Sequence, residues 1–178
     1  MVMRNFLLIL DGPTGAGKTT AANAVHPLFP RTALLGMDRV KWAISHYKRI
    51  SRNNAIVNDV IFAMTKEFLK HHLNVIVEQG FREGVVEAYQ SLGNKLGVKV
   101  VTIQLTASRK VLLSRIVARR KTAEALQHPL LPMSRILRNI RRHGAKRPIR
   151  GLVVDTTLLR PRQVAAIIVG YIKKPSRP

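Results

Sequence analysis

Short apolar runs alternate with amphipathic segments along the whole chain. The runs of strand length lie at 6–10, 32–35, 74–77, 98–105 and 151–154. Each run is nearly continuous in apolar residues, which is typical of strands that are buried on both faces of a sheet. The pattern therefore predicts five buried strands.

Between these runs, apolar residues recur at helical spacing. The spacing predicts helices at 18–25, 39–47, 55–71, 85–96, 109–121, 134–142 and 162–172. Strands that alternate with helices predict an α/β fold with a parallel sheet and helices on both faces. A chain of 178 residues suffices for a single domain of this kind, at 1–178. We expect its basic tail, residues 173–178, to be disordered.

A glycine-rich segment joins the first predicted strand to the first predicted helix. It reads Gly12-Pro-Thr-Gly15-Ala-Gly17-Lys18-Thr19 and fits the phosphate-binding pattern G-x-x-x-x-G-K-[ST]. Backbone N–H groups in such a loop converge on phosphate together with the helix N-terminus. The residues expected to bind ATP here are Gly12, Thr14, Gly15, Ala16, Gly17, Lys18, Thr19 and Thr20. Lys18 is expected to contact the β- and γ-phosphates, and the Thr19 hydroxyl to bind Mg²⁺.

From this loop onward the sequence resembles the small P-loop kinases. That group contains adenylate, shikimate and gluconate kinases, chloramphenicol phosphotransferase, zeta toxins and polynucleotide 5′-kinases. The resemblance spans nearly the whole chain and rests on the P-loop and on segments 34–39, 75–78 and 113–120. It implies a three-layer P-loop NTPase fold with a five-stranded parallel sheet of order 2-3-1-4-5. It also implies a helical lid, expected at 120–134, and transfer of the γ-phosphate to an acceptor hydroxyl.

Two carboxylates at the ends of predicted strands are candidate catalytic groups. Asp38 follows the second strand, at the sheet edge where open α/β sheets bind ligands. The resemblance implies that Asp38 accepts the proton of the acceptor hydroxyl, and it would also suit the N-cap of a helix beginning at Arg39. Glu78 ends the third strand, where the resemblance implies a carboxylate, more commonly Asp, that orients Mg²⁺. Glu78 could instead act as the base, pair with a lid arginine, or be a plain strand-end charge.

Arg115 and Arg119 are candidate nucleotide ligands. They lie four residues apart, so a helix brings them to one face. Their segment resembles the start of the adenylate kinase lid, which implies that Arg115 stacks on adenine and that Arg119 reaches the phosphates. A planar guanidinium suits both tasks. The alternative is a solvated basic helix face.

The chain is strongly basic. It contains 31 Lys and Arg against 9 Asp and Glu, for a net charge of +22 and 46% hydrophobic residues. This hydrophobic content argues against disorder, and the charge predicts anionic partners. Residues 109–150 hold 13 Lys and Arg and one acid, Glu124. The residues expected to contact an anionic acceptor such as RNA are Arg39, Lys41, Arg135, Arg138, Arg141 and Arg142.

Composition removes several other classes of function. The sequence has no cysteine, which excludes disulfides, thiolate metal sites and thiol catalysis. No apolar stretch approaches 18 residues, so we expect a soluble, cytoplasmic protein without a membrane partner. The oligomeric state stays open.

The leading hypothesis is a kinase that uses ATP and Mg²⁺ and acts on RNA or on a nucleotide-like anionic acceptor. The alternatives are a small-molecule kinase of the metabolite or antibiotic type, an RNA- or ribosome-associated ATPase, and a toxin-like kinase of nucleotide sugars.

Overall fold

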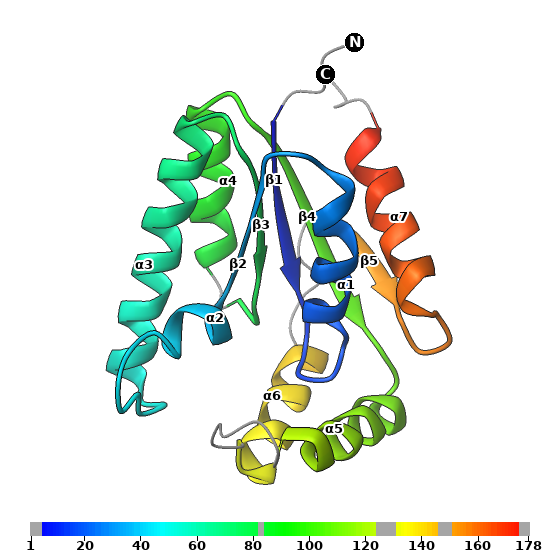
Figure 1. Cartoon of the computed structure of the whole chain (residues 1–178). Helices are drawn as coiled ribbons and strands as arrows, with labels where there is room; N and C mark the ends of the chain where they lie inside the picture. Colours follow the sequence, from blue (N-terminus) through cyan, green and yellow to red (C-terminus); the bar gives the residue numbers. More distant parts are fainter. Residues whose placement is uncertain (1–4, 82–83, 124–130, 146–150, 175–178) are drawn as a thin grey trace.

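Five parallel strands form the centre of the fold. The computed structural model describes residues 5–81, 84–123, 131–145 and 151–174. The strands are β1 (Phe6–Asp11), β2 (Thr32–Gly36), β3 (Asn74–Glu78), β4 (Lys99–Thr106) and β5 (Leu152–Asp155). They form one sheet in the order β2-β3-β1-β4-β5, which confirms the expected topology (Figure 1).

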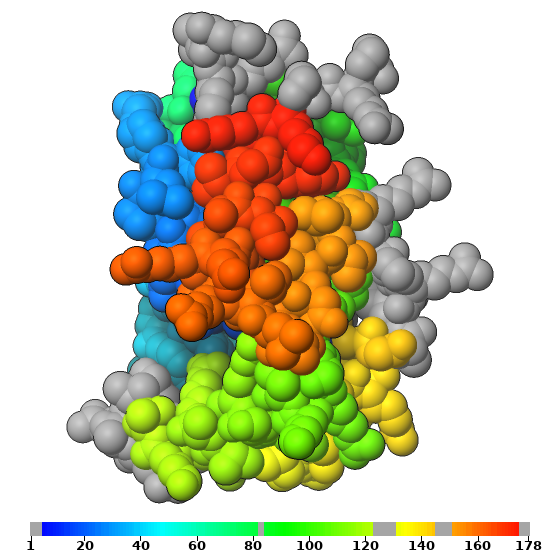
Figure 2. All heavy atoms as spheres, turned by 90° about the vertical axis from the view of Figure 1, so that its right-hand side faces the viewer, coloured from blue at the N-terminus to red at the C-terminus, as the bar shows by residue number. Residues whose placement is uncertain are grey.

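Helices cover both faces of the sheet and its carboxyl edge. They are α1 (Lys18–Val25), the 3₁₀ turn η1 (His26–Leu28), α2 (Met37–Lys41), α3 (Ser51–Lys70), α4 (Val85–Lys95), α5 (Arg109–Ala123), α6 (Met133–Ala145) and α7 (Pro161–Lys173). In Figure 1, α1 and α7 lie on one face and α3 and α4 on the other, while α5 and α6 lie beyond the strands' carboxyl ends. Figure 2 shows α7 above α5 on the side of β5. The three-layer α/β prediction is thus confirmed.

Strand β1 explains why the first apolar run is continuous. Its side chains alternate between two cores: Phe6, Leu8 and Leu10 pack with α1 and α7, whereas Leu7 and Ile9 pack with α3 and α4. Both edges of β1 are also paired, with β3 on one side and β4 on the other. A strand in this position needs apolar residues at every point along its length.

Each strand ends one residue later than its apolar run predicts. The additional residues are Asp11, Gly36, Glu78, Thr106 and Asp155. Parallel pairing continues through them, as in the Cα partners Gly36 and Glu78 or Thr106 and Asp155. A backbone can keep its ladder hydrogen bonds after its side chains become polar. The carboxyl edge of the sheet is therefore built largely from polar residues.

The helix predicted at 39–47 is wrong in extent. Helix α2 covers only Met37–Lys41, and the chain then turns, with His46 in the left-handed region at φ 53°. Ile44 is exposed whereas Val40 and Tyr47 pack against the core, so the apolar spacing in this range does not mark one continuous buried helix face. Helix α3 starts at Ser51, four residues before its predicted start.

The lid predicted at 120–134 falls only partly on described residues. Helix α5 continues to Ala123 and α6 begins at Met133, while residues 124–130 lie outside the described part of the chain. The disordered tail predicted at 173–178 starts too early, because Lys173 is the last residue of α7; residues 175–178 are not described. Within the described ranges, none of the helices has the length and apolar character needed to cross a bilayer.

Two neighbouring isoleucines on α7 provide a test of this packing. Ile168 is fully buried against the sheet, whereas Ile167 is 38% exposed. We expect Ile168→Ala to lower the free energy of unfolding by about 2–5 kcal/mol, because it leaves a cavity in a packed core. Ile167→Ala, the matched control, should change it by about 0.5 kcal/mol or less. Urea denaturation measures both, and equal losses would contradict the assigned face of α7.

Candidate active site

The P-loop connects β1 to α1 at the carboxyl edge of the sheet. Gly15 and Gly17 have φ of 88° and 90°, a left-handed conformation that glycine adopts readily. At Gly12, an added Cβ would lie 2.3 Å from the Leu105 carbonyl oxygen, so a side chain there would collide with β4. The glycines of the motif therefore allow the loop to curl tightly beside the sheet.

The Lys18 side chain folds back onto this loop. Its ammonium donates to the carbonyl oxygens of Gly12, at 2.8 Å, and Pro13, at 3.1 Å. Burial lowers the pKa of Lys18, and the carboxylates of Glu78 and Asp11 partly oppose that shift. A partly desolvated cation held within the loop suits an anionic ligand, because electrostatic attraction is stronger where water is excluded.

Thr19 and Glu78 come together across neighbouring elements. The Thr19 hydroxyl lies 3.2 Å from each carboxylate oxygen of Glu78. Burial raises the pKa of Glu78, while Lys18, the Thr19 hydroxyl and more distant arginines oppose that shift. Oxygen donors of this kind are the ligands that Mg²⁺ prefers. The pair therefore has the chemistry of the expected metal-binding residues.

Arg115 lies between the P-loop and the chain that follows β5. Its guanidinium donates to the Thr156 carbonyl oxygen at 2.7 Å and to the Thr156 hydroxyl oxygen at 2.9 Å. A longer contact, 3.5 Å, reaches the Gly15 carbonyl oxygen. The Thr156 hydroxyl in turn lies 3.2 Å from the Ala16 carbonyl oxygen. Arg115 is thus fixed beside the loop that is expected to hold the nucleotide.

Asp38 and Arg119 meet although they are far apart in sequence. Arg119 Nη2 on α5 lies 3.8 Å from Asp38 Oδ2 on α2, and Asp38 also forms an ion pair with Lys41. The interpretation of Asp38 as an N-cap is wrong, because α2 is capped by Gly36 and Asp38 is its second residue. The Asp38 carboxylate therefore faces other side chains of the site.

Lys41 and Arg119 pair with Asp38, and two further arginines lie close to these cations. We call Asp38, Lys41, Arg49, Arg119 and Arg135 the acceptor-side cluster. The Lys41 ammonium and the Arg49 guanidinium lie 5.0 and 5.1 Å from the centre of the Trp42 ring. Arg135 on α6 donates to the Arg49 carbonyl oxygen at 2.9 Å. The cluster thus combines side chains from α2, α5, α6 and the turn before α3.

Lys41 corrects one expectation about the basic surface. The sequence predicts that Lys41 contacts an anionic acceptor such as RNA, but this residue is only 4% exposed. Burial, together with the nearby positive charges of Arg49 and Arg119, lowers its pKa to about 7. The pKa of Arg49 is also lowered. Burial is the larger cause, and the nearby positive charges of Arg119 and Arg135 lower it further. The cluster therefore holds repelling cations close together.

The other predicted contacts lie outside this cluster. Arg39 is exposed and donates to Asn23 of α1 at 2.8 Å. Thr20 is an exposed residue of α1, and Arg138, Arg141 and Arg142 are exposed on α6. The predicted basic residues are thus distributed over several surfaces instead of one.

Two residues of the site were missed by the sequence analysis. Asn139 on α6 accepts hydrogen bonds from the Thr14 backbone N–H at 2.8 Å and from the Thr14 hydroxyl at 3.1 Å. Asp11 is fully buried, and its carboxylate accepts the Phe81 backbone N–H at 2.9 Å. Asp11 had a signal, because a charged residue ends the apolar run directly before the P-loop. Asn139 had none, since no spacing links it to that loop.

The strand order and the P-loop give the chain the fold of the small P-loop kinases. A family model described as an AAA domain matches residues 7–142. The chain therefore belongs to this AAA domain family. No curated protein matches the sequence.

Solved structures share the fold at low sequence identity. A kinase candidate from Chloroflexus aurantiacus is 23% identical with a TM-score of 0.71, covering 94% of this chain and 98% of that chain. The APS kinase CysC of Mycobacterium tuberculosis, in complex with AMPPNP and APS, is 11% identical with a TM-score of 0.68, covering 97% and 100%. A chain of the Pnkp1/Rnl/Hen1 RNA repair complex is 16% identical with a TM-score of 0.67, covering 82% and 46%.

Gly36 provides a test of the Glu78 position. A Cβ at Gly36 would lie 2.6 Å from Glu78 Oε1, while its extended backbone, at φ −157°, accepts any residue. Gly36→Ala should therefore displace the carboxylate and raise the Mg²⁺ concentration needed for ATP binding, with little change in stability. Thermal shift with ATP at graded Mg²⁺ measures this. Gly170→Ala, where an added Cβ meets nothing within 4 Å, is the control, and identical Mg²⁺ curves for the two variants would contradict the assignment.

Proposed function

We propose that the protein is a kinase that uses ATP and Mg²⁺ to phosphorylate a hydroxyl group of an anionic acceptor, either an RNA end or a nucleotide-like molecule. The observation that carries this proposal is the approach of Arg119 to Asp38, at 3.8 Å. Arg119 is also close enough to Lys18 to contribute to the lowering of its pKa. A candidate base, a candidate phosphate-stabilising arginine and the P-loop lysine are thus electrostatically linked.

The nucleotide side of the proposal rests on the P-loop. Its backbone and Lys18 would hold the β- and γ-phosphates, and Thr19 with Glu78 would hold Mg²⁺, which neutralises phosphate charge during transfer. Arg115, held by Thr156, would contact the adenine. A kinase of similar fold described in complex with AMPPNP supports ATP as the donor.

The transfer step uses Asp38 and Arg119. The Asp38 carboxylate takes the proton of the acceptor hydroxyl as the oxygen bonds to the γ-phosphorus. The bond between that phosphorus and the oxygen bridging to the β-phosphate then breaks, and ADP leaves. Arg119 would stabilise the negative charge that spreads over the transferring group, a role suited to a guanidinium. The ion pair with Lys41 orients the Asp38 carboxylate.

The acceptor-side cluster favours an acceptor that carries negative charge. Two cations pair with the single carboxylate of the cluster, and two more lie close to them. Burial lowers the pKa values of Lys41 and Arg49, and repulsion from the neighbouring cations lowers them further. A phosphate group bound next to the reacting hydroxyl would offset that repulsion, because opposite charges attract strongly in a partly desolvated site. A neutral metabolite or antibiotic would leave the cations uncompensated.

Lys18→Ala tests donor binding. We expect this variant to lose ATP binding and transfer, because Lys18 supplies the P-loop's side-chain charge for the phosphates. Thermal shift with ATP and Mg²⁺ measures binding, and circular dichroism verifies that the fold is intact. A folded variant that still transferred the γ-phosphate at the normal rate would refute the kinase proposal.

Asp38→Asn tests the base. We expect turnover to fall by roughly 10² to 10⁴ while ATP affinity stays unchanged, since a proton acceptor acts in the transition state. Glu78→Gln is the comparison variant. It should mainly raise the Mg²⁺ concentration that ATP binding requires. The rate of transfer to an acceptor library that includes RNA and nucleotides measures both. A larger loss of turnover in Glu78→Gln, with normal metal dependence, would transfer the base role to Glu78.

A further inference from the structure

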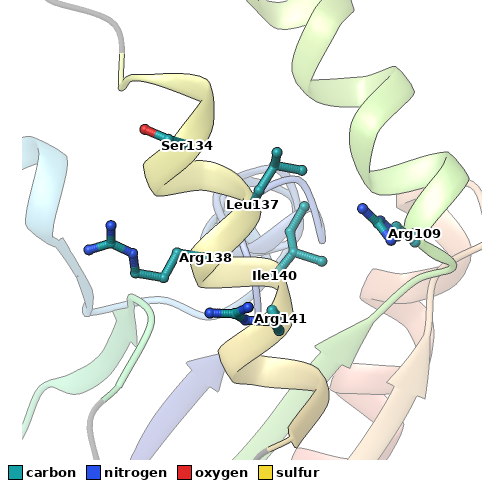
Figure 3. Close-up of a pocket in the computed structure, with 6 residues that line it drawn as sticks. All are labelled: Arg109, Ser134, Leu137, Arg138, Ile140 and Arg141. Atoms are coloured by element: carbon teal, nitrogen blue, oxygen red, sulfur yellow. The ribbon is translucent and has the colours of Figure 1, made fainter.

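A second basic surface lies between α5 and α6. The two helices enclose a groove of about 400 Å³ that is lined by Arg109, Ser134, Leu137, Arg138, Ile140 and Arg141. In Figure 3, Leu137 and Ile140 point from α6 toward α5, and Arg109 faces them from α5. Arg138 extends from the other flank of α6. The groove thus combines an apolar strip with guanidinium groups on both sides.

The groove lies on a different face of α6 from the ATP site. Asn139 reaches Thr14 of the P-loop, and Ile136 and His143 on the same side of the helix are buried. Arg138 and Arg141 are exposed. The described parts of α5 and α6 contain no Asp or Glu, and no ion pair is found for either arginine among the described residues. The structure therefore leaves this positive charge available to an external anion.

Arginines connect the groove to the acceptor-side cluster. Arg135 belongs to that cluster through its contact with Arg49, and Arg138 and Arg141 follow at intervals of three residues. Each interval advances about 4.5 Å along a helix. A row of cations thus leads from the candidate acceptor site along α6 to the groove.

We infer that the α5–α6 groove binds a single-stranded polynucleotide whose end occupies the acceptor-side cluster. The arginines would contact its phosphates, and Leu137 with Ile140 would pack against an unstacked base. A single strand fits because its bases are accessible, whereas those of a duplex are stacked and paired. The volume is within the range of small-ligand sites, enough for a nucleotide unit. The inference deepens the proposed function and rests on it only for the identity of the reacting end.

Binding without ATP tests the groove separately from catalysis. The probe is a labelled single-stranded oligoribonucleotide, titrated by fluorescence anisotropy at several salt concentrations. We expect Arg138→Glu with Arg141→Glu to weaken binding at least tenfold, and to flatten the log–log salt slope by about 1.4, because each lost phosphate contact removes roughly 0.7. Neutral Arg138→Gln with Arg141→Gln should flatten it similarly.

The control has the same change of charge on another face. Arg162→Glu with Lys173→Glu alters two exposed residues of α7, so it lowers the net charge equally without touching the groove. We expect it to keep the slope of the unmodified protein. Equal weakening by the α6 and α7 pairs would overturn the inference, because it would show that only the overall charge matters. Binding of anionic phosphatidylserine vesicles through the same arginines, without oligonucleotide binding, would also overturn it.

Steady-state kinetics separate the groove from the acceptor site. The two acceptors are an oligoribonucleotide with a free 5′-hydroxyl and a nucleoside 3′-monophosphate. The double variant Arg138→Glu with Arg141→Glu should raise KM for the oligonucleotide about tenfold or more. It should leave kcat and KM for the mononucleotide unchanged. Transfer to the mononucleotide without groove-dependent RNA binding would refute only the inference that the groove binds RNA. Groove-dependent binding without transfer to either acceptor would instead refute the proposed kinase function for these acceptors.

Discussion

The double burial of β1 is the constraint on which the rest of the structure depends. This strand is paired on both edges and packed on both faces, so its carboxyl end has a fixed position. The P-loop starts there, and Gly12 lies so close to Leu105 that a Cβ would meet the carbonyl oxygen at 2.3 Å. Glu78 pairs in register with Leu10, which brings its carboxylate to Thr19. The apolar core thus determines where the polar groups of the site converge.

Much of this arrangement could be predicted from sequence. Apolar periodicity located all five strands, and the glycine pattern located the P-loop, because both reflect local requirements of the backbone and of the core. Prediction from sequence failed at the ends of elements, which depend on tertiary contacts. Each strand continued onto a residue such as Asp11 or Glu78, since backbone pairing does not depend on side-chain polarity. Helix α2 stopped at Lys41, and Ala43 and Ile44 directly after it are exposed.

In the candidate site, too, the sequence could select individual residues but not the contacts between them. Asp38 could be selected because it follows a strand, but its contact with Arg119 depends on how α5 crosses the sheet edge. Lys41 looked like one more surface cation, and only the packing of the turn around Trp42 shows that it is buried. Asn139 carries no sequence signal, since its hydrogen bonds to Thr14 join residues 125 positions apart. Spacing rules work within an element, and long-range contacts fall beyond them.

Helices α5 and α6 each connect the P-loop region to the acceptor-side cluster. On α5, Arg115 contacts Gly15 and Thr156, and Arg119, four residues later, approaches Asp38.

On α6, Arg135 contacts the Arg49 carbonyl oxygen, and Asn139, again four residues later, holds Thr14. One helical turn separates the members of each pair, so each helix presents both on one side. A shift of either helix must therefore change contacts on both sides at once. In the proposed kinase, a substrate that fixes α5 or α6 would therefore also order the contacts for the other substrate, because the same rigid elements carry both sets.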